Sequence, residues 1–216
     1  MGVREKFDYD LTILSQKLVQ LGDLAEESLD QAFKAFESQD CELALRVLEG
    51  DEQVNMLEEE INDFALLLIA KQQPVAIDLR RIIVGIKIAA DIERMADYAV
   101  NIAKATIRIG KQPHLHPITE LKHMHAIMLE MLKLAIKAYE DEDTQAAKQI
   151  AAMDDQVDHL YGICMKNIIS AEEVTFQQKS QLSFVARHIE RSADHATNIA
   201  ENIYYLVRGR HLDLNK

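Results

Sequence analysis

The chain has 216 residues, of which 48% are hydrophobic, and its formal net charge is −12 with a pI of about 5.1. This length and apolar content are enough to bury a core, which excludes a disordered protein, and a surface this acidic repels phosphate backbones, which disfavours nucleic-acid binding. With only seven glycines and three prolines, turns are few, so we expect a small number of long helices rather than many short strands.

The composition also bears on location. The first ten residues, MGVREKFDYD, lack the apolar run of a secretory signal. The most apolar stretches, residues 64–70 and 82–90, are too short or too charged to span a bilayer. Cys41 and Cys164 fall in helical patterns without metal-type pairing, which fits a reducing cytosol. We therefore expect a cytoplasmic protein that reaches a membrane only through a partner.

Five breaks divide the chain into six predicted helices. The first helical pattern ends at residues 38–40, where Asp40 is expected to cap the next helix. The second ends at residues 71–74, because Pro74 cannot lie inside a helix. Residues 110–117, with one glycine and two prolines, form the strongest break and are interpreted as a linker. The remaining breaks fall at residues 141–143 and near residues 170–175.

The second half of the chain repeats the first, helix by helix and in the same order. AFKAFE recurs as AIKAYE, and DEQVNML recurs as DDQVDHL at the same offset. The third helices are the closest pair, since ERMADYAVNIA (93–103) and ERSADHATNIA (190–200) differ at three positions. Such a repeat indicates duplication of a whole unit. We predict an all-α fold of two tandem three-helix bundles, residues 1–112 and 113–216, with antiparallel neighbours.

The repeated third helices carry polar residues one turn apart: Glu93, Asp97 and Asn101 in the first, and Glu190, Asp194 and Asn198 in the second. A single Glu-x-x-x-Asp pattern is usually a solvated stripe. At 100° per residue, however, Glu93 shares a face with apolar side chains, whereas Asp91, Arg94 and Tyr98 are assigned to the solvent side. Adjacent carboxylates on an apolar face require protons, basic groups or cations to neutralise them.

The middle helix of each unit supplies further oxygen donors. Asp51 and Asn55 border the core face of the second predicted helix, and Asp154 and Asp158 occupy the matching positions in the repeat. Two helices that present carboxylates at one-turn spacing can surround an oxygen-preferring cation or a small iron cluster. The alternative is that arginines neutralise these carboxylates, the candidates being Arg80, Arg81, Arg187 and Arg191. The histidines at 114, 116, 123 and 125 are interpreted as solvent-exposed residues around the linker.

Two copies of E-R-x-x-D-x-A-x-N-I-A, together with DEQVN, DDQVD and QQPVAIDLRRI, make the chain resemble the PhoU family over essentially its whole length. The resemblance implies that the E(D)xxxD motifs bind metal ions, including multinuclear iron clusters. It implies a repressor of the phosphate-starvation response, which couples the Pst phosphate ABC transporter to the PhoR–PhoB two-component system and restrains phosphate uptake. The implied metal residues are Glu93, Asp97, Asp51 and Asn55 in the first unit, and Glu190, Asp194, Asp154 and Asp158 in the second.

The sequence departs from the family pattern in two respects. Ala96 and Ala193 stand where glycine is common, and Asn55 stands where a carboxylate is typical. We therefore expect weaker or different metal occupancy in the first unit than in the second.

The leading hypothesis is a non-enzymatic negative regulator of the Pho regulon. It would be a homodimeric, metal-binding adaptor between the ATPase subunit of a Pst transporter and a PhoR-type histidine kinase, with iron, manganese, zinc or magnesium bound. One alternative is a carboxylate-bridged, di-iron-like helical-bundle enzyme. Another is a purely structural polar network that fixes the register of the helices.

Overall fold

The computed structural model describes residues 3–111 and 118–214, and this part of the chain contains six helices and no strand. The helices are α1 (Val3–Ser38), α2 (Cys41–Gln72), α3 (Ala76–Ile109), α4 (Ile118–Asp141), α5 (Ala146–Ser170) and α6 (Phe176–Arg208). The all-α prediction is confirmed, and each predicted break falls between two helices. Most of the predicted linker, residues 112–117, lies outside the described residues.

Local chemistry explains where the helices begin and end. The Asp40 carboxylate accepts hydrogen bonds from the backbone N–H groups of Glu42 and Leu43, at 2.9 and 3.0 Å, which confirms it as the N-cap of α2. Pro74 lies in the short gap between α2 and α3. At the start of α6, Thr175 and Gln178 form a reciprocal capping box.

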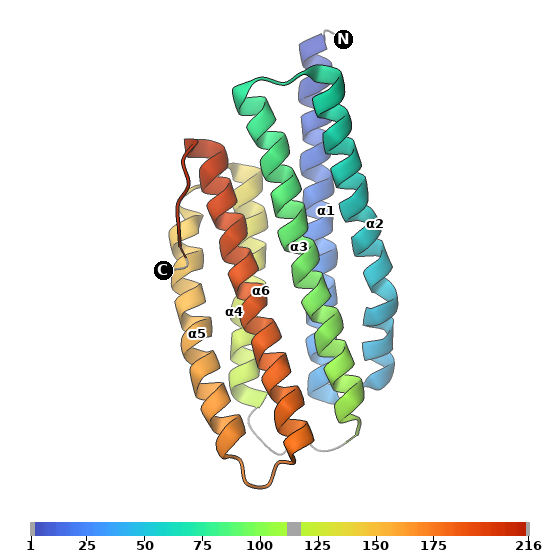
Figure 1. Cartoon of the computed structure of the whole chain (residues 1–216), viewed down its shortest axis with the longest axis vertical. Coiled ribbons are helices and arrows are strands. Elements are labelled where there is room, and N and C mark those ends of the chain that lie inside the picture. Colours follow the sequence, from blue (N-terminus) through green and yellow to red (C-terminus); the bar gives the residue numbers. More distant parts are fainter. Residues whose placement is uncertain (1–2, 112–117, 215–216) are drawn as a thin grey trace.

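The six helices form two three-helix bundles that lie side by side (Figure 1). Helices α1, α2 and α3 pack together in the first, and α4, α5 and α6 in the second. The bundles meet where α3 packs along α6 and, less extensively, where α1 packs along α4. A single apolar core runs through all six helices, so α3 and α6 are each covered by three other helices rather than two.

Equivalent positions of the two repeats meet across the junction of α1 and α4. Gly22 lies against Ile136, so close that a Cβ on Gly22 would be 2.8 Å from the Ile136 Cδ1 atom. Phe33 stacks on His125, with ring centroids 4.2 Å apart and an interplanar angle of 11°. In the sequence repeat Gly22 corresponds to His125, and Ile136 to Phe33. The two contacts are therefore related by the approximate two-fold symmetry of the duplicated units.

The interpretation of His125 as a solvent-exposed linker residue is wrong. Its side chain is only 6% exposed, and neither ring nitrogen has a hydrogen-bond partner among the described residues. Burial lowers the pKa of His125 to about 4, although the nearby carboxylates Asp30 and Glu37 oppose that shift. His123, two positions earlier, is exposed as expected, and His114 and His116 lie outside the described residues.

Candidate metal-binding carboxylate clusters

The first cluster joins Asp51 of α2 to Glu93 and Asp97 of α3. Burial raises the pKa of Asp51, and the neighbouring Asp97 carboxylate raises it further. Burial likewise raises the pKa of Glu93, again with Asp97 as the next cause. Like charges act this way only at short range, so the fold brings together the three carboxylates that the sequence predicted. Glu58 of α2 also raises the pKa of Glu93 and belongs to the same surface.

Arg94 neutralises part of this first cluster. Its Nη1 lies 2.8 Å from the Asp97 Oδ2, and its Nε lies 3.6 Å from the Glu93 Oε2. Arg94 is largely exposed, as the helical pattern predicted, yet its long side chain folds back over the motif. The Asn55 amide donates to the Asp51 Oδ2 at 3.1 Å, and Asn55 itself is exposed.

Two arginines predicted as neutralisers bind elsewhere. Arg80 donates to the Leu206 carbonyl oxygen at 3.3 Å and lies over the Tyr205 ring. Arg81 forms ion pairs with Asp78 and Glu142. Both therefore join helix α3 to its surroundings near its N-terminal end, several turns before Glu93, and the prediction for these two residues is wrong.

The second cluster contains four carboxylates: Asp154 and Asp158 on α5, and Glu190 and Asp194 on α6. Burial raises the pKa of Asp154 to about 7, helped by the charges of Asp194 and Asp158. Burial also raises the pKa of both Glu190 and Asp194, and the Asp158 charge acts on each of them. The fold therefore assembles all four predicted carboxylates, although Asp158 is itself exposed.

Arg187 neutralises one oxygen of the second cluster, as the sequence predicted. Its Nη1 lies 2.9 Å from the Glu190 Oε1. The other oxygen of Glu190, Oε2, is buried and has no hydrogen-bond partner among the described residues. A buried carboxylate oxygen without a hydrogen-bond partner costs free energy. The hydrogen-bonding capacity of Glu190 is therefore only partly satisfied in this arrangement.

The two predicted asparagines lie differently. The Asn198 amide is directed to α3, where its Nδ2 lies 3.5 Å from the Asp91 Oδ1. Asn101, the equivalent residue on α3, is half-buried. Asn198 therefore belongs to the contact between α3 and α6 as well as to the motif that contains Glu190.

The donor chemistry of both clusters suits a hard cation. All the clustered side chains offer oxygen, which magnesium, manganese and iron accept, whereas zinc sites favour histidine and cysteine. Among residues 3–111 and 118–214, however, no three aspartate, glutamate, histidine or cysteine side chains are arranged as a formed metal-binding group. In this arrangement Arg94 and Arg187 hold carboxylates that would have to turn toward a shared cation.

The assignment of Asp91 and Tyr98 to the solvent side is wrong, because α6 covers that side of α3. The His195 Nδ1 lies 2.9 Å from the Asp91 Oδ1, and Asn202 donates to the Asp91 Oδ2 at 3.4 Å. Tyr98 stacks on His188, with ring centroids 5.5 Å apart. The repeat holds a signal for these contacts, since Asp91 corresponds to His188 and Tyr98 to His195.

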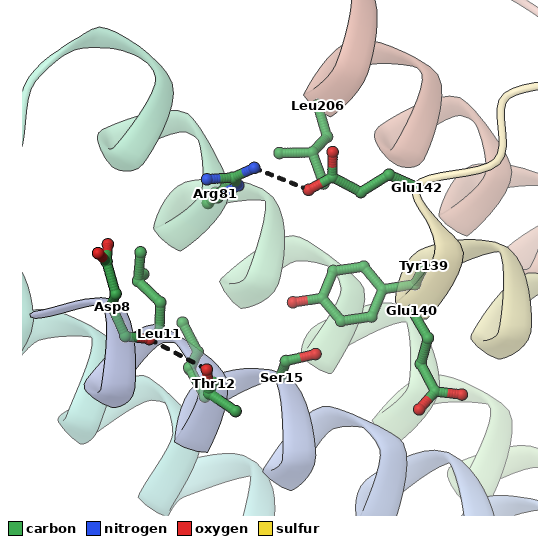
Figure 2. A pocket seen from close by; sticks show the side chains of 10 residues that line it. Asp8, Leu11, Thr12, Ser15, Arg81, Tyr139, Glu140, Glu142 and Leu206 are labelled. Carbon is green, nitrogen blue, oxygen red and sulfur yellow. Dashed lines mark hydrogen bonds and ion pairs between the residues drawn. The ribbon is translucent and has the colours of Figure 1, made fainter. Parts of the chain in front are cut away.

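A cavity of about 310 Å³ lies at the junction of the two bundles, on the side of α1 and α4. Figure 2 shows the Tyr139 side chain pointing into it beside Ser15, with the Arg81–Glu142 ion pair at its rim, 3.0 Å long. Burial raises the pKa of Tyr139 to about 12, while a hydrogen bond with Ser15 opposes the shift. The Tyr139 hydroxyl therefore stays protonated near neutral pH and is no general base.

The sequence matches the family model described as "PhoU domain" twice, at residues 18–106 and 121–203. The chain therefore belongs to the PhoU family. It is 35% identical to the phosphate-specific transport system accessory protein PhoU homolog of Clostridium acetobutylicum, over 98% of this chain and 99% of that protein. It is 36% identical to the homolog so named in Aquifex aeolicus, over 93% of this chain and 92% of that protein.

Solved structures agree with this assignment. The crystal structure of PhoU from Pseudomonas aeruginosa matches with a TM-score of 0.90 and 30% identity, over 94% of this chain and all of that one. The phosphate transport system regulatory protein PhoU from Streptococcus pneumoniae matches with the same TM-score and identity, over 96% of this chain and 99% of that one. Within the described residues, no helix is both long and apolar enough to cross a bilayer.

Proposed function

We propose that this protein is a non-enzymatic negative regulator of phosphate uptake and of the phosphate-starvation response. The observation that carries the proposal is its whole-length similarity to proteins named as accessory or regulatory proteins of phosphate transport. The duplicated motif stands on α3 and on α6 in the same relation to a neighbouring helix, which supports a shared role for both units. Its proposed partners are the ATPase subunit of a Pst transporter and a PhoR-type sensor kinase.

The two carboxylate clusters are the proposed metal sites. The pKa values of Glu93, Asp154, Glu190 and Asp194 are all raised by burial and by neighbouring carboxylates. A divalent cation would relieve both effects, because it binds the ionised form of each group. Asn101 and Asn198 are the proposed amide donors at the ends of the motifs, and Asn55 takes the place of a fourth carboxylate in the first unit.

The enzymatic alternative finds less support in the described residues. A metal-assisted reaction needs an acid or base beside a substrate cavity. At the cavity beside Tyr139, the hydroxyl of that residue has a pKa of about 12 and is no such base, and Arg81 is paired with Glu142. The proposed homodimer is a separate prediction, which light scattering of the purified chain tests.

Metal content of the untagged protein is the first test. Wild type should retain iron, manganese or magnesium, and Asp97→Ala/Asp194→Ala should lose most of it. The matched control is Glu52→Ala/Asp155→Ala, which removes two exposed carboxylates at equivalent positions of α2 and α5. Metal loss in the control as well, or no metal in reconstituted wild type, would leave the clusters as a structural network.

Partner binding is tested separately. The chain should capture the transporter ATPase subunit and the kinase from defined mixtures, and the proportion captured should change between high and low phosphate. Failure to capture either partner in both conditions would contradict the adaptor role, whatever the metal analysis shows.

A further inference from the structure

An open cavity of about 440 Å³ lies on the contact between α3 and α6. Its lining is unusual for a chain with a net charge of −12, because one carboxylate stands there among several donors. The lining residues are Tyr98 of α3 and Arg187, Arg191, Asp194, His195 and Asn198 of α6. The second carboxylate cluster accounts for Asp194, for Asn198 and for the Arg187 contact with Glu190, but it does not account for the remaining donors of Arg187, for the exposed Arg191, or for the Tyr98 and His195 side chains beside them.

The two arginines supply the binding capacity. Arg187 and Arg191 lie one turn apart on α6, so their side chains reach the same surface. Arg187 uses one N–H group for Glu190, at 2.9 Å, which leaves four of the five donors of its guanidinium. Arg191 is exposed and forms no hydrogen bond or ion pair within the described part of the chain, although its charge lowers the pKa of Glu190 and of Asp194 against the rise that burial causes. Paired guanidinium groups recognise tetrahedral oxyanions because each can donate two parallel hydrogen bonds.

The rest of the cavity is fixed by contacts across the helix pair. His195 is held by Asp91 at 2.9 Å, and the Tyr98 ring is held between His188 and His195. The Asn198 amide makes only a long contact, 3.5 Å, to the same Asp91, so it keeps a donor for a ligand. These side chains form a positioned wall beside the guanidinium groups of Arg187 and Arg191.

The first repeat does not reproduce this arrangement. Ala90 stands on α3 at the position of Arg187. Arg94, which corresponds to Arg191, is already paired with Asp97 at 2.8 Å. The pair of available arginines is therefore found on α6 alone, although the carboxylate motif is present on both helices.

Asp194 selects among oxyanions. A carboxylate repels an anion unless that anion donates a hydrogen bond to it. Hydrogen phosphate carries a P–OH group near neutral pH, whereas sulfate carries no proton. The half-buried Asp194 carboxylate therefore favours an anion that can donate to it and repels one that cannot. Phosphate monoesters, which are mostly fully ionised at pH 7.5, lack that donor as well.

We propose that this cavity binds inorganic hydrogen phosphate, with the Arg187 and Arg191 guanidinium groups on its oxygens and the Asp194 carboxylate accepting from its hydroxyl. This proposal extends the proposed function and rests on it for one point, which is that phosphate is the regulatory signal. Asp158 and Glu190 act on Asp194 electrostatically, so a cation in the second cluster strengthens phosphate binding by removing their repulsion.

Calorimetric titration of the purified chain with phosphate tests the site. It is run at pH 7.5 after chelation and repeated in magnesium, without any partner protein. Wild type should bind one phosphate per chain in at least one condition, at least tenfold more tightly than sulfate or AMP. Arg191→Gln should weaken phosphate binding at least tenfold, whereas Arg108→Gln, which removes an exposed arginine in the last turn of α3, should leave it unchanged.

Asp194→Asn should bring phosphate and sulfate affinities within about threefold of each other, since an amide can donate to sulfate. Thermal unfolding of each variant confirms that it is folded. No saturable phosphate binding by wild type, equal sulfate binding by wild type, or equal losses in Arg191→Gln and Arg108→Gln would each overturn the assignment. Phosphate binding with no effect of phosphate on partner capture would contradict the proposed function and leave the site intact.

Discussion

Asp91 of α3 and His195 of α6, 104 positions apart in the chain, meet with their Oδ1 and Nδ1 atoms 2.9 Å apart. Asn198 and Asn202 of α6 donate to the same carboxylate. One acidic side chain of the first repeat thus receives three donors from the second. Its symmetry-related contact, Tyr98 on His188, is aromatic, so duplication kept the meeting point of the helices while the chemistry of the two contacts diverged.

Asp91→Ala should lower the free energy of unfolding by about 1–3 kcal/mol, because it leaves three half-buried donors of α6 without their acceptor. Urea unfolding followed by circular dichroism measures the effect. Glu52→Ala, which removes an exposed carboxylate on α2, should stay within about 0.5 kcal/mol of wild type. Equal stability of the two variants would show that the network around Asp91 adds nothing to the joining of the bundles.

Gly22→Ala should destabilise the protein by about 1–3 kcal/mol, because the new methyl group would lie 2.8 Å from both Cδ1 and Cγ1 of Ile136. Gly50→Ala is the matched control, since nothing lies within 4 Å of a Cβ there. In mid-helix that change should stabilise by about 0.5–1 kcal/mol. Thermal unfolding distinguishes the two, and Ile136→Val should recover part of the loss in Gly22→Ala.

His125→Phe should reduce the dependence of stability on pH between about 7 and 4. The pKa of His125 in the folded protein is about 4, below the ordinary histidine value of 6.5. The unfolded chain therefore binds the proton first, and stability is complete above about pH 6.5 and falls as pH drops toward 4. Over that interval the free energy of unfolding of the wild type should fall by up to about 3 kcal/mol, and His125→Phe should not show this loss.

The phenylalanine preserves the stacking on Phe33, so the comparison isolates the proton. Urea unfolding at a series of pH values gives both curves. His123→Gln, which changes an exposed histidine of the same helix, should follow the wild-type curve. Parallel curves for wild type and His125→Phe would mean that His125 does not couple protonation to folding.

Asn55→Asp should raise metal affinity in the first unit at least severalfold, because it supplies the carboxylate that Asp158 supplies in the second. Calorimetry with manganese, on protein in which Asp194→Ala has disabled the second unit, measures this site alone. Gln53→Glu adds the same charge at an exposed position of α2 and should leave the affinity unchanged. A similar gain in both variants would trace the effect to net charge.

The fold was largely predictable from local information. Helices form where apolar residues recur with a period near 3.6, and they end where Asp40, Pro74 or the capping box at Thr175 interrupts the pattern. The duplication could be recognised from the sequence because the same residues recur at the same offsets. Both carboxylate clusters were predictable for the same reason, since a helical wheel shows that Glu93 shares a face with apolar neighbours.

The sequence by itself thus determined six helices, two repeats and the candidate carboxylates. Only the tertiary structure decided which helix covers each face: α6 turns Asp91 and Tyr98 from surface residues into contact residues, and α1 buries His125. It also decided that Arg94 reaches Glu93 and Asp97 while Arg80 and Arg81 bind elsewhere. The physical reason is that the helical period determines how side chains are arranged around their own helix. Burial and ion pairing depend instead on which neighbouring helix packs against each face.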